Sequence, residues 1–179
     1  MVTRKVLRSG IILAAIFAVV FFAGSGSAMA ASKNCSNVGT FIGSDTDLGT
    51  TWVVTMTRGQ SATVGELLQE WVSITDPTFG GKVSAARLTD AMGVWKKVNG
   101  KKFQFTWIAY GFDAGGVMVC AVRASGVGTM TQCDQVELTY VLEFFGPTQD
   151  ISAETPTYGT VCGAGIETRM ALVQVSCPD

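Results

Sequence analysis

The chain has 179 residues, a formal net charge of −1 and no histidine. Without histidine it cannot use Ser-His-Asp or Cys-His nucleophile systems, histidine-ligated metals or histidine acid–base catalysis. The sequence also has no basic stripe, which argues against binding to nucleic acid, and no Gly-rich phosphate loop between a strand and a helix.

The first thirty residues have the three parts of a secretory signal peptide. Three basic side chains within residues 1–8 precede an apolar run over residues 11–23, and small residues ending in Ala-x-Ala follow. We therefore predict a signal-peptide helix over residues 1–30, cleavage between Ala30 and Ala31, and a secreted or periplasmic protein. The alternative is an uncleaved anchor, but the run is shorter than the ~20 residues of a spanning helix, so no stable membrane span is expected after cleavage.

The part after the signal peptide, residues 31–179, is acidic and carries all five cysteines. Removing the three basic side chains of the signal leaves ten basic and fourteen acidic ones, a net charge of −4. Export implies an oxidising compartment in which disulfides persist, and the odd number leaves at least one thiol unpaired. A bond between Cys35 and Cys177 is one arrangement, although spacing does not decide the connectivity. Cys120, inside a predicted strand, is expected to be a buried free thiol.

Runs of β-branched and aromatic residues, separated by Gly, Asn, Asp and Pro, recur along the mature part. Residues 31–48 are polar and are interpreted as an entry segment, with a short strand at 38–42, before a barrel domain over residues 49–179. In chain order the further predicted strands cover residues 52–57, 66–74, 93–98, 103–112, 117–125, 126–131, 136–145 and 158–175, the last being one strand or a strand pair. Residues 66–74 also fit a helical face, but their β-branched end and the all-β neighbourhood favour a strand. The glycines of the last strand, Gly163 and Gly165, predict a bulge or a sharp bend.

The spacing of these strands leaves room for hairpins but not for crossover helices. Asn99-Gly100 and the Gly-rich residues 113–116 are turn signals of the kind that joins antiparallel neighbours. The sequence therefore predicts an all-β fold, an antiparallel up-and-down β-barrel of about 8–9 strands, because closure removes exposed strand edges. A barrel of this size can be filled by side chains or can hold one small ligand.

Polar side chains inside the predicted strands are the candidate site residues. One hypothesis is that Arg123 and Glu143, with Tyr110 or Tyr140, form a polar spot in an apolar pocket that aromatic residues such as Trp107 line. A charge inside a barrel must be paired or hydrogen-bonded, since an isolated buried ion is very costly. The alternative is that these side chains face solvent or form a structural ion pair. No cofactor and no metal site is expected.

Two features resemble known families. Residues 48–52 resemble the Gly-x-Trp signature of the lipocalins and wider calycins, with two residues between Gly and Trp in place of one. The resemblance implies that Arg169 packs over that Trp. Residues 93–97, 103–113 and 122–124 are similar to segments of exported bacterial β-barrel proteins in which they follow in this order. These resemblances imply a lipocalin-like barrel, calycin-like or allene-oxide-cyclase-like, and leave the activity open.

The expected function is the binding of a small apolar ligand inside the barrel. One alternative is an isomerase or cyclase that acts on an apolar substrate in the cavity, with Glu143 as its acid or base. Another is a solid barrel that serves as a structural or interaction module. The sequence identifies neither the ligand nor the oligomeric state.

Overall fold

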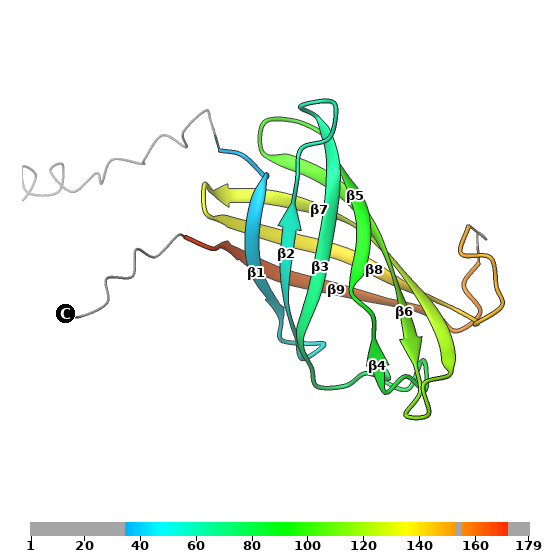
Figure 1. Cartoon of the computed structure of the whole chain (residues 1–179). Coiled ribbons are helices and arrows are strands. Elements are labelled where there is room, and N and C mark those ends of the chain that lie inside the picture. Colours follow the sequence, from blue (N-terminus) through cyan, green and yellow to red (C-terminus); the bar gives the residue numbers. More distant parts are fainter. Residues whose placement is uncertain (1–34, 153–154, 172–179) are drawn as a thin grey trace, which may run out of the picture. The chain divides into compact units, whose positions relative to one another are not determined.

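The chain closes into a barrel of eight antiparallel strands with one short extra strand beside it (Figure 1). The computed structural model describes residues 35–152 and 155–171. The signal-peptide prediction, the cleavage site and Cys177 lie outside these residues. The predicted all-β, up-and-down barrel is confirmed.

Each barrel strand pairs with the strands before and after it, and β1 pairs with β9 to close the ring. The short β4 pairs with one end of β6, so β3 pairs directly with β5. Within the described part of the chain the strands are β1 (Gly39–Asp45), β2 (Thr50–Met56), β3 (Val64–Ile74), β4 (Arg87–Leu88), β5 (Ala91–Lys97), β6 (Lys102–Phe112), β7 (Met118–Gln132), β8 (Gln135–Phe145) and β9 (Gly159–Arg169).

Alternation along the strands decides which side chains face the barrel interior. In β8 the alternate apolar residues from Val136 to Phe144 are buried or half-buried, while Glu137 and Thr139 between them are exposed. In β6, Phe103, Phe105 and Trp107 are buried, and the residues between them are more exposed. Because successive side chains of a strand point to opposite faces, this alternation produces one apolar inner face around the whole barrel.

Strand direction divides the loops between the two ends of the barrel. The β1–β2 turn, the β3–β4 loop, the β6–β7 turn and the β8–β9 loop share one end, which we call the loop end. The β2–β3, β5–β6 and β7–β8 connections share the opposite end. The β1–β2 turn and the β3–β4 loop supply residues to the site described below.

Two strand predictions differ from the structure. The residues predicted as separate strands at 117–125 and 126–131 form the single strand β7, whose pairing with β6 runs through Gly126 and Gly128. These glycines do not end the strand. A Cβ on Gly126 would lie 2.7 Å from the Phe105 ring, so the missing side chain makes room for an aromatic neighbour.

The barrel also begins earlier than the sequence suggests, because β1 lies inside the residues assigned to the entry segment. It pairs with β2 over its full length and with β9 over four residues. The bulge predicted at Gly163 and Gly165 is wrong, since both residues pair in continuous register with β8. A Cβ on Gly163 would collide with the ring of Tyr140, so this glycine too admits an aromatic ring.

One disulfide joins Cys35 to Cys133, across a sequence separation of 98 residues. The pairing of Cys35 with Cys177 is therefore wrong. Cys120 is buried and free, as predicted, and burial raises the pKa of its thiol. Cys162 is free and exposed.

Arg169 closes the barrel near this disulfide. Its guanidinium lies 4.6 Å from the centre of the Phe41 ring and donates to the carbonyl oxygens of Val38, Ser36 and Cys133. The expectation that Arg169 packs over Trp52 is wrong, because the aromatic partner is Phe41. No helix among residues 35–152 and 155–171 is long and apolar enough to cross a membrane.

Candidate functional site

The barrel encloses a cavity, here called the barrel cavity, that extends to the loop end. Its empty space, with the opening to solvent included, is about 520 Å³, and a water-sized molecule can centre itself in about 30 Å³ of it. A single water needs about 10–15 Å³ on this second measure, so the cavity is narrow but not filled. Its lining is Leu48, Thr50, Trp52, Val54, Met56, Leu67, Gln69, Trp71, Phe79, Phe103, Phe105, Trp107, Leu138, Tyr140, Leu142 and Glu167.

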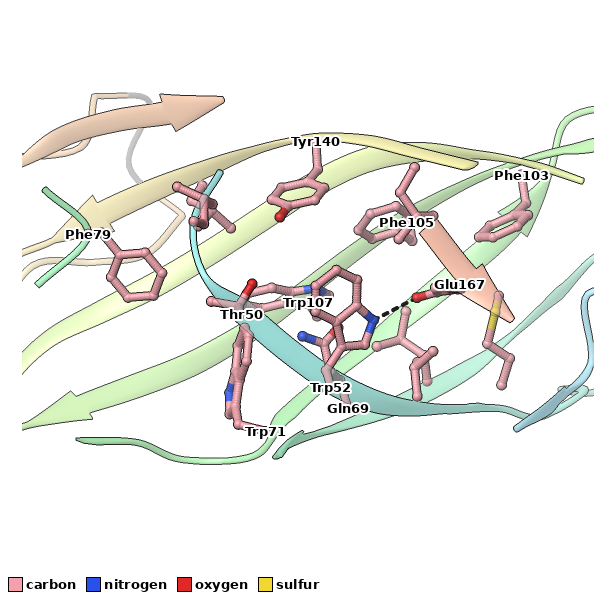
Figure 2. A pocket seen from close by; sticks show the side chains of 16 residues that line it. Thr50, Trp52, Gln69, Trp71, Phe79, Phe103, Phe105, Trp107, Tyr140 and Glu167 are labelled. Atoms are coloured by element: carbon pink, nitrogen blue, oxygen red, sulfur yellow. Dashed lines mark hydrogen bonds between the residues drawn. The ribbon is translucent and has the colours of Figure 1, made fainter. Parts of the chain in front are cut away.

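Aromatic rings make up much of this wall (Figure 2). Trp71 and Trp107 meet edge to face, with ring centres 5.7 Å apart and planes at 80°. The indole N–H of Trp71 donates to the carbonyl oxygen of Thr89, 3.0 Å away, which fixes the ring from outside the barrel strands. The Trp71 ring is therefore anchored, and the two rings together offer large apolar surfaces that suit a flat apolar molecule.

Trp52 and Glu167 form the polar centre of the wall. The indole N–H of Trp52 donates to Oε1 of Glu167 over 2.8 Å (Figure 2). Gly43 lies between them in register on β1, and a Cβ there would lie 2.6 Å from the Trp52 indole nitrogen and 2.7 Å from Cγ of Glu167. Glycine at this position is thus what allows the two side chains to meet.

Glu167 is an unusual carboxyl group because it is only 4% exposed and has no cationic partner among the described residues. Burial raises its pKa to about 7, against the smaller opposing effect of the hydrogen bond from Trp52. A carboxyl group in this state changes its protonation near neutral pH, as acids and bases in active sites do.

Besides the indole N–H of Trp107, two further polar side chains face the cavity with no hydrogen-bond partner among the described residues. Gln69 is 6% exposed and Thr50 is 3% exposed, and both line the cavity. Within the described part of the chain, Nδ2 of Asn37 is the one fully enclosed side-chain atom that lacks a partner. The polar atoms of Gln69 and Thr50 therefore touch the empty space of the cavity, where a ligand could reach them.

Asp45 is buried too, but its hydrogen-bonding capacity is already used. It accepts from the Tyr140 hydroxyl at 2.6 Å and from the backbone N–H groups of Asp47, Leu48 and Ala164 at 2.9–3.1 Å. Burial and the hydrogen bond to Asp45 raise the pKa of Tyr140, so its hydroxyl stays neutral. This pair shapes the β1–β2 turn and presents the Tyr140 ring to the cavity.

A loop residue partly closes the cavity at the loop end. Phe79 has a φ of 50°, an unusual value for a residue with a side chain, and Gly80 and Gly81 follow at 72° and 78°. The carboxylate of Asp76 holds this turn by accepting from Gly80 and from Thr78. The turn directs the Phe79 ring inward, where its centre lies 5.1 Å from that of Phe144.

The sequence hypothesis combined five residues that the structure separates. Tyr140 and Trp107 line the barrel cavity. Arg123, Glu143 and Tyr110 do not, and Tyr110 is exposed. The pocket prediction therefore has two of its three aromatic residues in place, while Tyr110 and both charged residues lie elsewhere.

Arg123 and Glu143 form an ion pair on the outer face of β7 and β8, where they face each other in register. Two nitrogens of the guanidinium donate to the two carboxylate oxygens, at 2.7 and 2.9 Å, and the third donates to the carbonyl oxygen of Ile151 at 2.8 Å. The guanidinium also lies over the Phe145 ring at 5.0 Å. This geometry fixes the β8–β9 loop against the barrel wall, which is the structural alternative stated from the sequence.

Sequence reasoning missed Thr50, Gln69 and Glu167 as cavity residues. A signal for Glu167 existed in β9, where it shares a face with Gly163 and Gly165, but small residues do not mark a face as inward. Gln69 shares the inward face of β3 with Leu67 and Trp71, but Leu68 and Val72 make the opposite face apolar too, so alternation did not show which face is inward.

The fold and the site together define an eight-stranded antiparallel β-barrel with an aromatic-lined internal cavity. In the described residues no group of three or more His, Cys, Asp and Glu side chains could hold a metal ion. A comparison with protein-family models found no match, and a comparison with curated protein sequences found none either. The lipocalin-like resemblance therefore remains a prediction from the residues that carry it.

Proposed function

We propose that this protein is an exported, lipocalin-like β-barrel that binds one small apolar molecule in its barrel cavity. The observation that carries the proposal is an apolar, aromatic cavity that contains polar side chains without partners. Ligand sites have this composition, with a mostly apolar lining and a few polar groups that fix orientation. The remaining space argues against a solid barrel that serves only as a structural module.

Apolar burial would supply most of the binding energy. Trp52, Trp71 and Trp107 offer large flat surfaces, and each square ångström of apolar surface removed from water contributes about 25 cal/mol. Among the described residues no lysine or arginine lines the cavity. An anionic ligand would therefore be buried without a counter-charge, which is costly.

The test is native mass spectrometry of the protein purified from its own host. We expect a bound molecule that co-purifies with the wild type. Leu138→Phe adds a ring inside the cavity and should expel that molecule, whereas Thr139→Phe, on the exposed face of the same strand, should retain it. Absence of any bound molecule, together with no binding of added small aromatic compounds, would overturn the proposal.

Export is part of the same proposal and rests on the signal-peptide pattern, with the disulfide of Cys35 and Cys133 in support. Such bonds are typical of oxidising compartments outside the cytoplasm. Sequencing the amino terminus of the protein from its host should give a chain that starts at Ala31. A chain that keeps the apolar run at residues 11–23 would contradict cleavage.

Glu167 favours a second candidate, an isomerase or cyclase that acts in the same cavity. A buried carboxyl group whose pKa is raised to about 7 suits proton transfer near neutral pH. Glu143, the acid or base named from the sequence, pairs with Arg123 outside the cavity. Proton transfer to or from carbon would exchange solvent deuterium into the ligand, which NMR in heavy water detects. A bound ligand that gains no deuterium or rearranged product would favour the binder.

A further inference from the structure

The polar side chains of the barrel cavity gather around one residue, Trp52. Glu167 on β9 and Trp52 on β2 both pair with Gly43 on β1, the strand between them. Glu167 therefore reaches the Trp52 indole across this glycine. Gln69 on β3 pairs with Val54, which lies two residues after Trp52 on β2. Thr50 lies two residues before Trp52 on the same strand. Figure 2 shows Glu167, Gln69 and Thr50 around the indole of Trp52. We call these three residues the polar wall.

The polar wall has unused hydrogen-bonding capacity. Oε1 of Glu167 accepts from Trp52, while Oε2 has no hydrogen-bond partner in the part of the chain that the structure describes. The amide of Gln69 offers two N–H donors and one acceptor, and the hydroxyl of Thr50 offers one donor. Buried polar groups are nearly always paired with protein, water or ligand, so three such groups around one cavity offer hydrogen bonds that a ligand atom could take in place of water.

We propose that the ligand is a small neutral molecule, one aromatic ring or similarly slender, whose carbonyl oxygen accepts hydrogen bonds from the polar wall. This inference rests on the proposed function and names the chemistry of its ligand. The narrow cavity sets the size, the rings of Trp71 and Trp107 favour a flat shape, and the absence of lysine and arginine from the described lining favours a neutral group.

The protonation state of Glu167 makes it a donor. Burial raises its pKa to about 7, so in mildly acidic solution the carboxyl group is protonated and can donate from Oε2. The charged or titratable groups nearest to it are Asp45 on β1, Tyr140 on β8 and Arg169 on its own strand. All three are held by other partners. Above pH 7 the wall loses this donor, and binding of a carbonyl compound should weaken.

Three one-ring probes of nearly equal shape test the inference by calorimetric titration at pH 6. Acetophenone carries the carbonyl oxygen, α-methylstyrene replaces that oxygen with CH₂, and 1-phenylethylamine replaces it with a cationic amine. We expect acetophenone to bind at least about fivefold more tightly than α-methylstyrene, since an unpaired buried polar group is costly. We expect this preference to shrink at pH 8.

Variants assign the preference to the polar wall. Glu167→Gln keeps an N–H donor at every pH, so its preference for acetophenone should be the same at pH 6 and pH 8. Thr50→Val is nearly isosteric and removes one donor, and it should reduce the preference. Thr139→Val, on the exposed outer face, is the matched control and should leave the preference unchanged.

The outcomes separate this inference from the function on which it rests. If acetophenone and α-methylstyrene bind equally, the barrel cavity binds apolar molecules but the carbonyl assignment is wrong. If the amine binds most tightly, the ligand is a cation and the inference is overturned. If no probe binds to the wild type, the inference fails, and the proposed function fails with it only if no molecule co-purifies with the protein from its host.

Discussion

Glu167 should make the stability of the barrel fall as pH rises toward neutrality. Its pKa is about 7 in the folded protein and 4.5 for an ordinary glutamate. Between these values the folded chain keeps the proton while the unfolded chain releases it, so the free energy of unfolding decreases with pH. At about 1.4 kcal/mol per pKa unit, the full effect is about 3 kcal/mol, complete above pH 7.

The comparison of wild type with Glu167→Gln isolates this effect. Glutamine can still accept the hydrogen bond from Trp52 but does not titrate, so the variant should gain about 3 kcal/mol relative to wild type between pH 4.5 and pH 8. Urea denaturation at a series of pH values measures the difference, and other acids cancel because both proteins contain them. Glu137→Gln, at an exposed position on β8, is the control and should show no such trend. A wild-type-to-variant difference that stays constant with pH would refute the reasoning.

Three further predictions concern the framework around the cavity. Gly43→Ala should destabilise the barrel by about 1–3 kcal/mol in thermal melts, because the new Cβ would overlap Trp52 and Glu167. Gly100→Ala is the control and should be nearly neutral, since a Cβ at that position has no atom within 4 Å. Arg123→Leu should lower the free energy of unfolding, measured in urea titrations, by about 1–2 kcal/mol, since its ion pair is about one-fifth exposed. Ligand affinity should stay unchanged, and a loss of affinity would place the residue in the site. Cys133→Ser should cost about 2–4 kcal/mol, and the same loss should follow reduction of the wild type.

The architecture was predictable because two local signals agree along the chain. Alternating apolar residues mark half-buried strands, and short turn sequences mark hairpins, so consecutive strands must be antiparallel neighbours. The long apolar face of β8 illustrates this, since every second residue from Val136 to Phe144 faces inward as the alternation predicts. The strand predicted at residues 66–74 is likewise confirmed as β3.

Glycine caused both errors of strand continuity. Gly126 and Gly163 suggested a break and a bulge, yet both lie in continuous strands beside the aromatic rings of Phe105 and Tyr140. A single sequence shows that a side chain is absent, but not that a neighbouring strand fills the space. The same limitation hid the contact between Trp52 and Glu167, which depends on Gly43 and on strands distant in sequence.

The charged residues of the site were harder to place, because alternation separates two faces without saying which is inward. Glu143 shares its face of β8 with Glu137 and Thr139, which indicates the outer wall, and its partner Arg123 follows it there. Glu167 lies on a face of small residues, so no apolar pattern marks it as internal. Its burial arises from barrel closure between β1 and β9, which only the three-dimensional register reveals.

The tryptophan side chains allow the most direct test of ligand binding inside the barrel. Trp52, Trp71 and Trp107 line the cavity, whereas Trp95 does not, and its indole N–H donates to the carbonyl oxygen of Thr57. In ¹H–¹⁵N spectra of the four indole groups, titration with acetophenone should shift the signals of the three lining residues along one saturating curve and leave Trp95 unchanged. A titration in which the three lining signals stay fixed, or in which Trp95 alone moves, would contradict an internal binding site.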